Sequence, residues 1–342
     1  MTLASFIFLI IILTIIFFLI RKWANGPLIS NKKDLTGKLI IITGASDGIG
    51  LETAKDLLSS NAKIIFACRN KAKTENVIKK LPENFQKNAN FVPLELESFK
   101  SIENFVKEIK TKYQKVDILI NNAGIGANLI YKTEDGYMNT FQVNYLGNVL
   151  LTLLLLDHFN EKESKIINVS SMAYKRAKLI YGDAKLLNNY DSMYEDYLKM
   201  RNKNGLYGNT KLLLNYFTQY LAEFTDKKYP YLKVVCLHPG VIYTNFIKFK
   251  NIIQKILFMF TFRILLFLFA KDVVHGAQNT LFLSYSDNKE LVNGAYYSNL
   301  KLEKYTSKGG DEKLKNEMVN ETLNILKSKY KELEYLPLSG QN

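Results

Sequence analysis

The sequence predicts an α/β protein with a doubly wound parallel sheet, preceded by an N-terminal transmembrane helix. Three observations lead to this class. Short β-branched runs alternate with longer amphipathic segments between residues 38 and 237, which is the pattern of repeated βαβ units. A glycine-rich turn joins the first run to the first amphipathic segment. Residues 3–20 carry no charge and consist mainly of Leu, Ile and Phe, so they are long and apolar enough to cross a bilayer.

The overall composition is that of a folded protein and excludes several other classes. Of the 342 residues, 47% are hydrophobic and 23% are charged, so the chain can bury a core. Two cysteines cannot build a disulfide framework, and the three histidines have no metal-ligand spacing, so no metal site is expected. The net charge of +14 is spread along the chain without a basic run interleaved with aromatics. We therefore expect no nucleic-acid partner.

Residues 1–22 are predicted to be a membrane anchor. The uncharged run ends at Arg21, Lys22 and Trp23, a typical interfacial group of cations and an aromatic. A cleaved signal peptide is the alternative, but no basic residue precedes the run and no small-residue cleavage site follows it. Because the flanking cations lie only on the C-terminal side, the rest of the chain is expected in the cytosol. The predicted location is a single-pass protein of the endoplasmic-reticulum membrane, with membrane lipid as a partner.

The main domain is predicted to span residues 36–330, after a linker at 23–35 and before a C-terminal tail at 331–342. The expected strands are 38–43, 63–67, 116–120, 165–169 and 232–237. The expected helices are 48–60, 98–113 with Ser98 as its N-cap, 140–159 and 207–224. Two stretches fall outside this alternation. Residues 172–206 are interpreted as a surface loop beside the substrate entrance, and residues 242–270 as part of a substrate lobe.

The turn after the first strand is predicted to bind a phosphate group. It reads Thr43-Gly44-Ala45-Ser46-Asp47-Gly48-Ile49-Gly50. Glycines let the backbone approach a pyrophosphate, and the helix that follows presents free N–H groups to the anion. A structural turn would explain one of these glycines but hardly all three. The turn therefore indicates a dinucleotide cofactor.

The T-G-x-x-x-G-x-G spacing of this turn resembles the short-chain dehydrogenase/reductase family, which has a Rossmann fold. Further motifs appear in the order of that family: Asn121-Asn122-Ala123-Gly124, Asn144 in FQVNYLG, Ser170-Ser171, Tyr207-x-x-x-Lys211 and His238-Pro239-Gly240. The resemblance covers about residues 36–330. The sequences ACRN, VNYLG and HPGVIYTN are most similar to the membrane-bound retinol dehydrogenase group.

The resemblance implies an oxidoreductase in which Tyr207 gives or takes the proton of an alcohol. Tyr207 and Lys211 are four positions apart on one helix face, and the ammonium is expected to lower the pKa of the phenol. Ser171 is expected to hydrogen-bond the substrate oxygen, and Asn144 to hold a water that links the lysine to solvent. The stretch from Ser171 to Tyr207 is longer than in many family members, as it is in the retinol dehydrogenase group.

The predicted cofactor is NADP(H). The second strand ends in Cys68-Arg69-Asn70, with no acidic residue for the ribose 2′-OH of NAD and with a guanidinium that suits a phosphate. An Arg69 that only faces solvent is the alternative, and it leaves the cofactor open. At Glu95 the family usually has an aspartate that contacts adenine. The expected cofactor residues are Gly44, Ser46, Asp47, Gly48, Ile49, Gly50, Arg69, Asn70, Glu95, Asn122, Ala123, Gly124, Tyr207, Lys211, Pro239, Gly240 and Thr244.

The substrate is expected to be a lipophilic alcohol, aldehyde or ketone. Within the predicted substrate lobe, about residues 241–275, the apolar stretch 252–270 is interrupted by Lys255 and Arg263. A buried core helix is one alternative, but we favour a flap that dips into the membrane. Retinoids, steroids and lipid aldehydes fit this expectation equally. A non-catalytic NADP(H)-binding scaffold or sensor is the alternative function, and a homodimer is one option for the assembly.

Overall fold

The computed structural model describes residues 3–127, 129–199, 204–242 and 269–340. Its strands are β1 Leu39–Thr43, β2 Lys63–Cys68, β3 Ala89–Pro93, β4 Ile118–Asn121, β5 Ser164–Val169, β6 Leu232–His238, β7 Tyr296–Ser298 and β8 Lys301–Glu303. They form one sheet in the order β3-β2-β1-β4-β5-β6-β7-β8. All neighbours are parallel except β7 and β8. The predicted doubly wound parallel sheet is confirmed.

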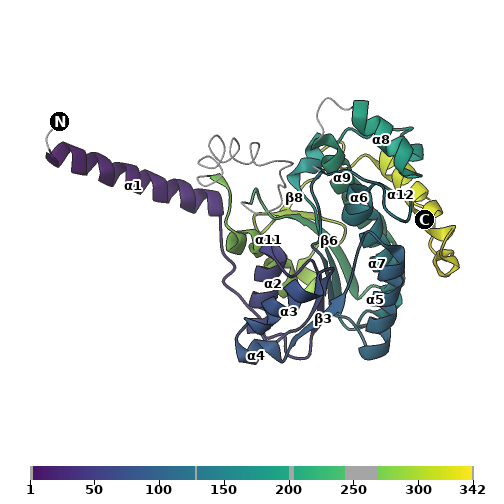
Figure 1. The fold of residues 1–342 in the computed structure, drawn as a ribbon, viewed down its shortest axis with the longest axis horizontal. Helices are drawn as coiled ribbons and strands as arrows, with labels where there is room; N and C mark the ends of the chain where they lie inside the picture. Colours follow the sequence, from purple (N-terminus) through teal and green to yellow (C-terminus); the bar gives the residue numbers. More distant parts are fainter. Residues whose placement is uncertain (1–2, 128, 200–203, 243–268, 341–342) are drawn as a thin grey trace.

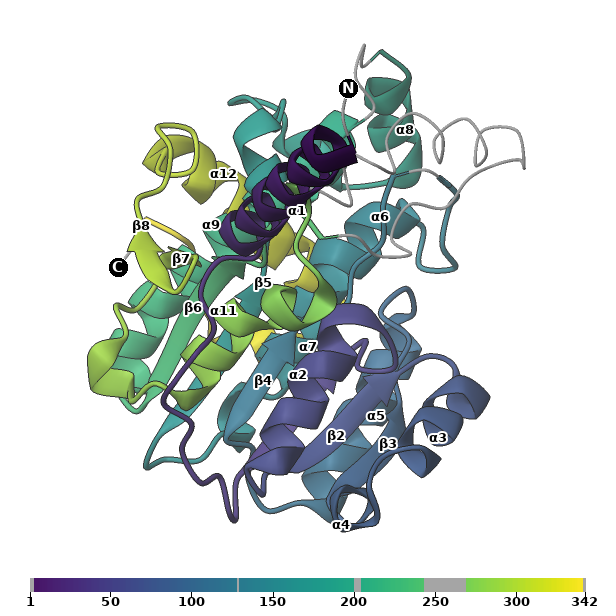
Figure 2. The ribbon, with the colours of Figure 1, turned by 90° about the vertical axis from the view of Figure 1, so that its left-hand side faces the viewer.

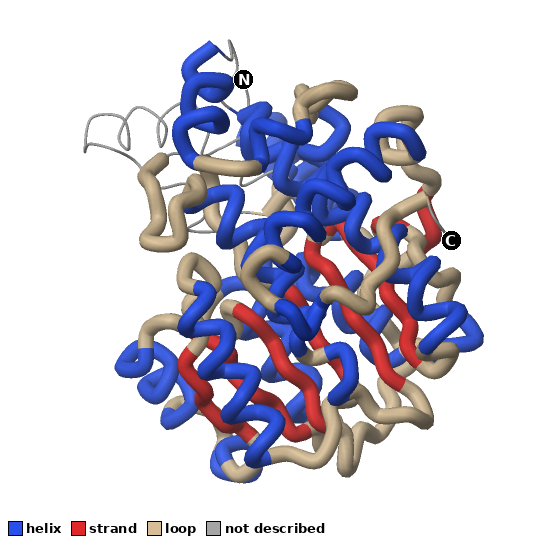
Figure 3. The backbone as a smooth tube through the Cα atoms, turned by 90° about the vertical axis from the view of Figure 1, so that its right-hand side faces the viewer, coloured by secondary structure: helices blue, strands red, loops and turns tan. Residues whose placement is uncertain are grey.

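Helices cover both faces of this sheet (Figure 1, Figure 3). One face carries α2 Gly48–Ser59, α3 Lys71–Lys79, α4 Glu83–Gln86 and α11 Val273–Tyr285. The other carries α5 Phe99–Lys112, α6 Asn139–Phe141, α7 Gly147–Leu154, α9 Asn204–Lys228 and α12 Glu312–Lys327. Each layer packs its apolar side chains into its own buried cluster against the sheet. β1 lies between β2 and β4, and all five of its residues are buried, which explains its uninterrupted apolar sequence.

The sequence predicted β1, β2, β4, β5 and β6 within one or two residues but missed β3, β7 and β8. β3 lies at the edge of the sheet and only two of its five residues are buried, so it lacks the apolar pattern of the central strands. β7 and β8 have three residues each, which is too short to give a periodic signal. The prediction that Ser98 caps α5 is confirmed, because its side chain accepts a hydrogen bond from the backbone N–H of Ser101.

The predicted helix 140–159 is not one regular helix. It is divided into α6, a π-helical turn at Gln142–Leu146, α7 and a 3₁₀ turn at Leu156–His158. A Cβ atom on Gly147, where α7 begins, would lie 2.3 Å from the carbonyl oxygen of Leu96. The π-helical turn thus comes just before a point of very close packing against the segment that precedes α5.

The insertion 172–206 is not only a surface loop. It contains 3₁₀ turns at Met172–Arg176 and Ala184–Leu187 and the helix α8 Tyr190–Lys199. Leu179, Leu187 and Met193 are buried in the same cluster as α9. These apolar side chains, widely spaced in a polar sequence, hold the insertion against the body.

The helix α1 Leu3–Asn25 projects away from the body (Figure 1, Figure 2). Its end is attached to the body, because Arg21 Nη1 donates to the carbonyl oxygen of Ala270 at 2.6 Å and Asn25 Oδ1 accepts from the N–H of Asp272 at 3.3 Å. Within the described part of the chain, no helix meets the length and apolarity required to cross a membrane. The predicted span is therefore not confirmed. Most of the predicted flap 252–270 lies outside the described residues.

Candidate active site

The predicted motifs meet at one edge of the sheet. The glycine turn follows β1, the Asn121–Gly124 loop begins at the end of β4, the serine pair follows β5, and Pro239-Gly240 follows β6. These strands are neighbours and parallel, so their carboxyl ends share an edge, which is where doubly wound sheets bind ligands.

The glycine turn has a backbone that other residues adopt only with strain. Gly44 and Gly48 have φ values of +69° and +53°, in the left-handed region that favours glycine. A Cβ atom on Gly50 would lie 2.5 Å from Asn122 Nδ2 and 2.6 Å from the carbonyl oxygen of Gly44. The turn therefore has to be free of side chains in order to pack against the loop after β4.

Thr43 ties these two loops together, although the sequence did not single it out as a site residue. Its Oγ1 accepts hydrogen bonds from the N–H groups of Asn122 at 3.0 Å and Ala123 at 2.9 Å. In return, Asn122 Nδ2 donates to the carbonyl oxygen of Thr43 at 2.8 Å. Its place directly before Gly44 was the available signal. Asn122 and Ala123 are thus fixed at the glycine turn, as the predicted cofactor site requires.

The polar residues of the turn also have structural partners. Asp47 caps α2 by accepting from the N–H of Gly48 at 2.8 Å. The hydrogen bond from Lys73 Nζ, at 2.6 Å, lowers the pKa of the Asp47 carboxyl.

The other side chains of the turn contact neighbouring elements. Ser46 hydrogen-bonds the buried thiol of Cys68, whose pKa is raised by burial. Ile49 lies close to Gly276 of α11. The turn therefore has the bare backbone that a pyrophosphate needs, at the start of a twelve-residue helix.

Arg69 lies at the end of β2, beside two acidic side chains. Its Nη1 donates to Glu97 Oε1 at 2.8 Å and to Glu95 Oε1 at 3.5 Å. Asn70 caps α3, where its Oδ1 accepts from the N–H of Lys73 at 2.8 Å. The structure thus places two of the predicted cofactor residues, Arg69 and Glu95, side by side and adds Glu97, which the sequence analysis did not select.

Tyr207, Lys211 and Ser171 come together where α9 crosses the end of β5. The Ser171 hydroxyl hydrogen-bonds the phenol of Tyr207. Lys211 Nζ lies 5.7 Å from the centre of the Tyr207 ring and donates to the carbonyl oxygen of Val169 at 2.7 Å. Lys211 is only 3% exposed, so its ammonium is held beside the phenol by the backbone of β5.

The pKa of Tyr207 shifts in the direction opposite to the prediction. Burial raises the pKa of the phenol to about 12, and the hydrogen bond with Ser171 opposes this rise only in part. Burial also lowers the pKa of Lys211 to about 8. Removing a phenol from water disfavours its charged form, and burial is here the largest cause of the shift. The sequence analysis considered the nearby ammonium and not the burial.

The two serines after β5 have different surroundings. Ser170 is 2% exposed, and its Oγ donates back to the carbonyl oxygen of Lys211 at 3.3 Å. Ser171 is half-buried, accepts from the N–H of Ala173 at 3.2 Å and contacts Tyr207. Only Ser171 thus lies beside the phenol, which supports its choice over Ser170.

Asn144 lies in the π-helical turn and is fully buried. Its Oδ1 accepts from the N–H of Ile125 at 2.7 Å, and its Nδ2 donates to the carbonyl oxygen of Ile125 at 2.8 Å. A Cβ atom on Gly124 would lie 3.3 Å from Asn144 Oδ1 and 3.7 Å from Lys211 Nζ. The side chain of Asn144 thus fastens the loop after β4 beside Lys211, while the predicted water stays a prediction.

The turn after β6 completes this edge. Gly240 has a φ of +102°, and a Cβ atom there would lie 2.7 Å from Cδ of Lys271. Burial and Lys271 lower the pKa of His238 to about 4, so this imidazole is neutral. Pro239 is half-buried beside it. The predicted cofactor residue Thr244 lies outside the described residues.

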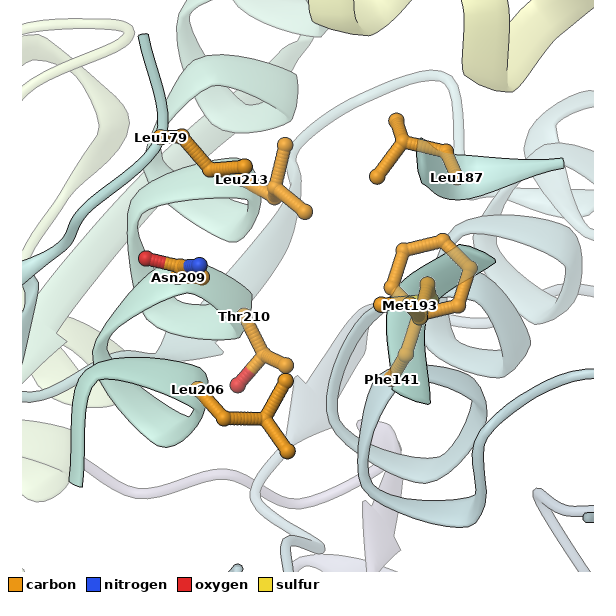
Figure 4. A pocket seen from close by; sticks show the side chains of 8 residues that line it. All are labelled: Phe141, Leu179, Leu187, Met193, Leu206, Asn209, Thr210 and Leu213. Carbon is orange, nitrogen blue, oxygen red and sulfur yellow. The ribbon is translucent and has the colours of Figure 1, made fainter. Parts of the chain in front are cut away.

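A small apolar pocket lies beside α9 (Figure 4). It is lined by Phe141, Leu179, Leu187, Met193, Leu206, Asn209, Thr210 and Leu213. Thr210 connects it to the site, because its Oγ1 donates to the carbonyl oxygen of Tyr207 at 2.8 Å and accepts from Asn144 Nδ2 at 3.3 Å. With about 10 Å³ of free volume, the pocket holds one water at most, so its residues support α9 rather than hold a substrate.

Known proteins that are similar to this chain in sequence or in fold are dehydrogenases or share their fold. Residues 38–182 match the family model described as short chain dehydrogenase. The chain is 33% identical to human retinol dehydrogenase 14 over 291 residues, which are 81% of this chain and 82% of that protein. It is 31% identical to human retinol dehydrogenase 13 over 310 residues, 90% of each chain. An uncharacterized protein from Mycobacterium paratuberculosis superposes with a TM-score of 0.67 at 22% identity, covering 88% of this chain and 98% of that one.

Proposed function

Because the chain belongs to the short-chain dehydrogenase family and is an oxidoreductase similar to retinol dehydrogenases, we propose that it interconverts a lipophilic alcohol and its aldehyde or ketone with NADP(H). The observation that carries this proposal is the contact between Ser171 and Tyr207, with Lys211 beside them. This contact lies at the same edge of the sheet as the glycine turn. The lipophilic substrate class follows from the retinol dehydrogenases among the relatives and from the apolar sequence 252–270.

The residues of the chain would supply the proton and the electrostatic stabilisation. The bound dinucleotide would supply or accept the hydride. Tyr207 protonates the substrate oxygen during reduction, and a pKa of about 12 keeps the phenol protonated at neutral pH. Ser171 donates to the same oxygen and stabilises its developing charge. Lys211, with a pKa of about 8, is mostly charged at pH 7 and stabilises the phenolate that remains.

The bare glycine turn would hold the pyrophosphate, with Asn122 and Ala123 alongside. Arg69 would hold the 2′-phosphate of NADP(H), since a guanidinium binds a phosphate through two parallel N–H bonds.

Turnover of NADPH by the purified protein tests this proposal directly. With a panel of retinoids, ketones and lipid aldehydes, we expect NADPH oxidation with at least one lipophilic carbonyl compound. The panel also identifies the substrate class. Binding of NADPH without turnover of any compound would instead favour a non-catalytic sensor or scaffold.

Replacing Arg69 by Glu is expected to shift the preference from NADPH toward NADH by at least about tenfold. The variant puts a negative charge where the phosphate partner was, and a carboxylate can accept from a ribose hydroxyl. The measurement is the ratio of kcat/KM for the two cofactors. Lys162→Glu carries the same charge change on an exposed residue just before β5, at the other end of the sheet, and should leave the ratio unchanged. A constant ratio in Arg69→Glu would remove Arg69 from the proposal.

We further propose that α1 attaches the protein to a membrane. Apolar side chains are exposed along it: Ile7, Phe8, Ile11, Ile12, Leu13, Ile15, Ile16, Phe18, Leu19 and Trp23. A surface of this kind is unfavourable in water, and Arg21 and Lys22 follow it as cations at a headgroup layer would.

Protease treatment of sealed microsomes that carry a C-terminally tagged chain tests the attachment and its orientation. We expect digestion of the tagged body without detergent and a small protected N-terminal fragment, because the flanking cations favour a cytosolic body. Full protection of the tag would reverse the orientation, and release by alkaline carbonate would mean that α1 does not span. Deletion of residues 1–22 should leave NADPH binding intact, since none of the predicted cofactor motifs begins before Thr43.

A further inference from the structure

The partners of Arg69 point to a residue that tunes the choice of cofactor. The guanidinium is well exposed, with 61% of its side chain open to solvent, whereas Glu97 is only 17% exposed. The bond from Arg69 Nη1 to Glu97 Oε1 measures 2.8 Å, against 3.5 Å to Glu95. Glu97 is therefore the main partner of the residue that would read the 2′-phosphate.

Glu97 is held in this position from its other side. The hydroxyl of Tyr131 donates to Glu97 Oε2 at 2.7 Å, so both carboxylate oxygens of Glu97 are engaged. The carboxyl group of Glu95 reaches the same Nη1 of Arg69 at 3.5 Å, and burial and the neighbouring Glu97 raise its pKa. A negative charge is thus built into the place where a phosphate would have to bind.

This charge affects the two cofactors unequally. A 2′-phosphate at Arg69 would lie within a few ångströms of the Glu97 carboxylate and be repelled by it. The 2′-hydroxyl of NADH carries no charge and can donate to a carboxylate. Among the described residues, Arg69 has no further hydrogen bond from Nη2 or Nε, so a phosphate can bind there while Glu97 keeps Nη1.

We propose that Glu97 is a specificity-determining residue that weakens NADPH binding at Arg69 and so narrows the preference for NADPH over NADH. Tyr131 is its positioning residue. The inference rests on the proposed role of Arg69 in binding the 2′-phosphate. It adds Glu97, in the segment before α5, as a residue that weakens the attraction between Arg69 and that phosphate.

The test is the Glu97→Gln variant, with the dissociation constants of NADPH and NADH measured by fluorescence titration. Gln keeps the shape of the side chain and removes the charge. Its Oε1 can still accept from Arg69, and its NH2 group can donate to the Tyr131 hydroxyl, which donates to Glu97 in the wild-type protein. We expect NADPH to bind about tenfold more tightly at low ionic strength and NADH to change by less than about twofold. High salt should shrink the NADPH effect, because the site is exposed, whereas a merely structural role would not respond to salt.

Two further variants make the result specific. Glu108→Gln carries the same change in net charge on α5, where Glu108 pairs with Lys112 at 2.6 Å, and it should leave both constants unchanged. Tyr131→Phe should tighten NADPH binding by a smaller factor, since it frees Glu97 to move away from Arg69.

The outcomes separate this inference from the proposed function. If Arg69→Ala weakens NADPH binding but Glu97→Gln does not strengthen it, the role of Glu97 is wrong and the proposed function stands. If the wild-type protein binds neither dinucleotide, or Arg69→Ala has no effect on NADPH binding, the NADPH proposal and this inference both fail.

Discussion

The Tyr207→Phe variant should lose at least about 100-fold in kcat while binding NADPH nearly as tightly as the wild-type protein. The phenol hydroxyl is the proposed proton donor to the substrate oxygen, and the ring alone cannot transfer a proton. Loss of general acid catalysis costs about 10²–10⁴-fold in rate. The aromatic ring stays in place beside Lys211, whose ammonium lies 5.7 Å from its centre, so the shape of the site is kept.

The measurement is kcat with saturating substrate, together with the dissociation constant of NADPH. Tyr220→Phe is the matched control, because Tyr220 lies on the same helix and its hydroxyl donates to the carbonyl oxygen of Pro337 at 2.7 Å, away from the site. It should retain kcat within about twofold. A Tyr207→Phe variant that keeps more than about a tenth of the wild-type rate would exclude Tyr207 as the proton donor.

The Ser171→Ala variant is expected to lose about 100-fold in kcat, and Ser170→Ala less than about threefold. Ser171 is the half-buried serine that contacts Tyr207, and removing a donor aimed at the developing oxyanion costs about 10²–10³-fold. Among the described residues, the Ser170 hydroxyl makes a long hydrogen bond of 3.3 Å to the backbone of Lys211, so its loss should affect stability slightly and chemistry little.

This pair of variants is informative because the two serines are adjacent and chemically identical. Both variants are assayed for kcat and for their melting temperature. Equal losses in kcat would mean that the serine pair acts only through the shape of the turn after β5. A larger loss in Ser170→Ala would reverse the assignment.

The sequence was most informative where a local pattern carries the structure. The apolar run of β1 predicts a strand buried on both faces, and the structure buries all five residues. The glycine turn, the Asn121–Gly124 loop, the serine pair and Pro239-Gly240 could be placed together because each follows a strand, and parallel neighbouring strands end at one edge. Tyr207 and Lys211 lie on α9, and the family resemblance placed them beside Ser171, which the structure brings next to Tyr207.

The features that the sequence could not predict depend on contacts between distant segments. Glu97 meets Arg69 across 28 positions, and no periodicity relates the two residues. The pKa of Tyr207 depends on how completely the fold excludes water. The spacing of Tyr207 and Lys211 on a helix predicts a positive charge near the phenol, but it does not predict the burial. The π-helical turn at Gln142–Leu146 contains no Pro or Gly, so no helix-breaking residue marks it in the sequence.

The insertion before Tyr207 was misread for a related reason. Its composition is polar, and the few apolar residues that bury it, such as Leu179 and Met193, are too far apart to form a helical or strand pattern. Their positions are determined by packing against α9, in the same buried cluster. A segment whose structure comes from its partner carries little signal of its own.

The order of strands in the sheet also determines how the protein can fold as it leaves the ribosome. The first three strands to be synthesised are neighbours, and β4 to β8 then join the free side of β1 one after another in chain order. No strand has to be inserted between two that have already paired, so the nascent chain can extend its sheet as synthesis proceeds. The glycine turn, Arg69 and Asn122 are therefore assembled before Ser171, Tyr207 and Lys211 have been translated. The half that would hold the dinucleotide can serve as the template on which the reactive half folds.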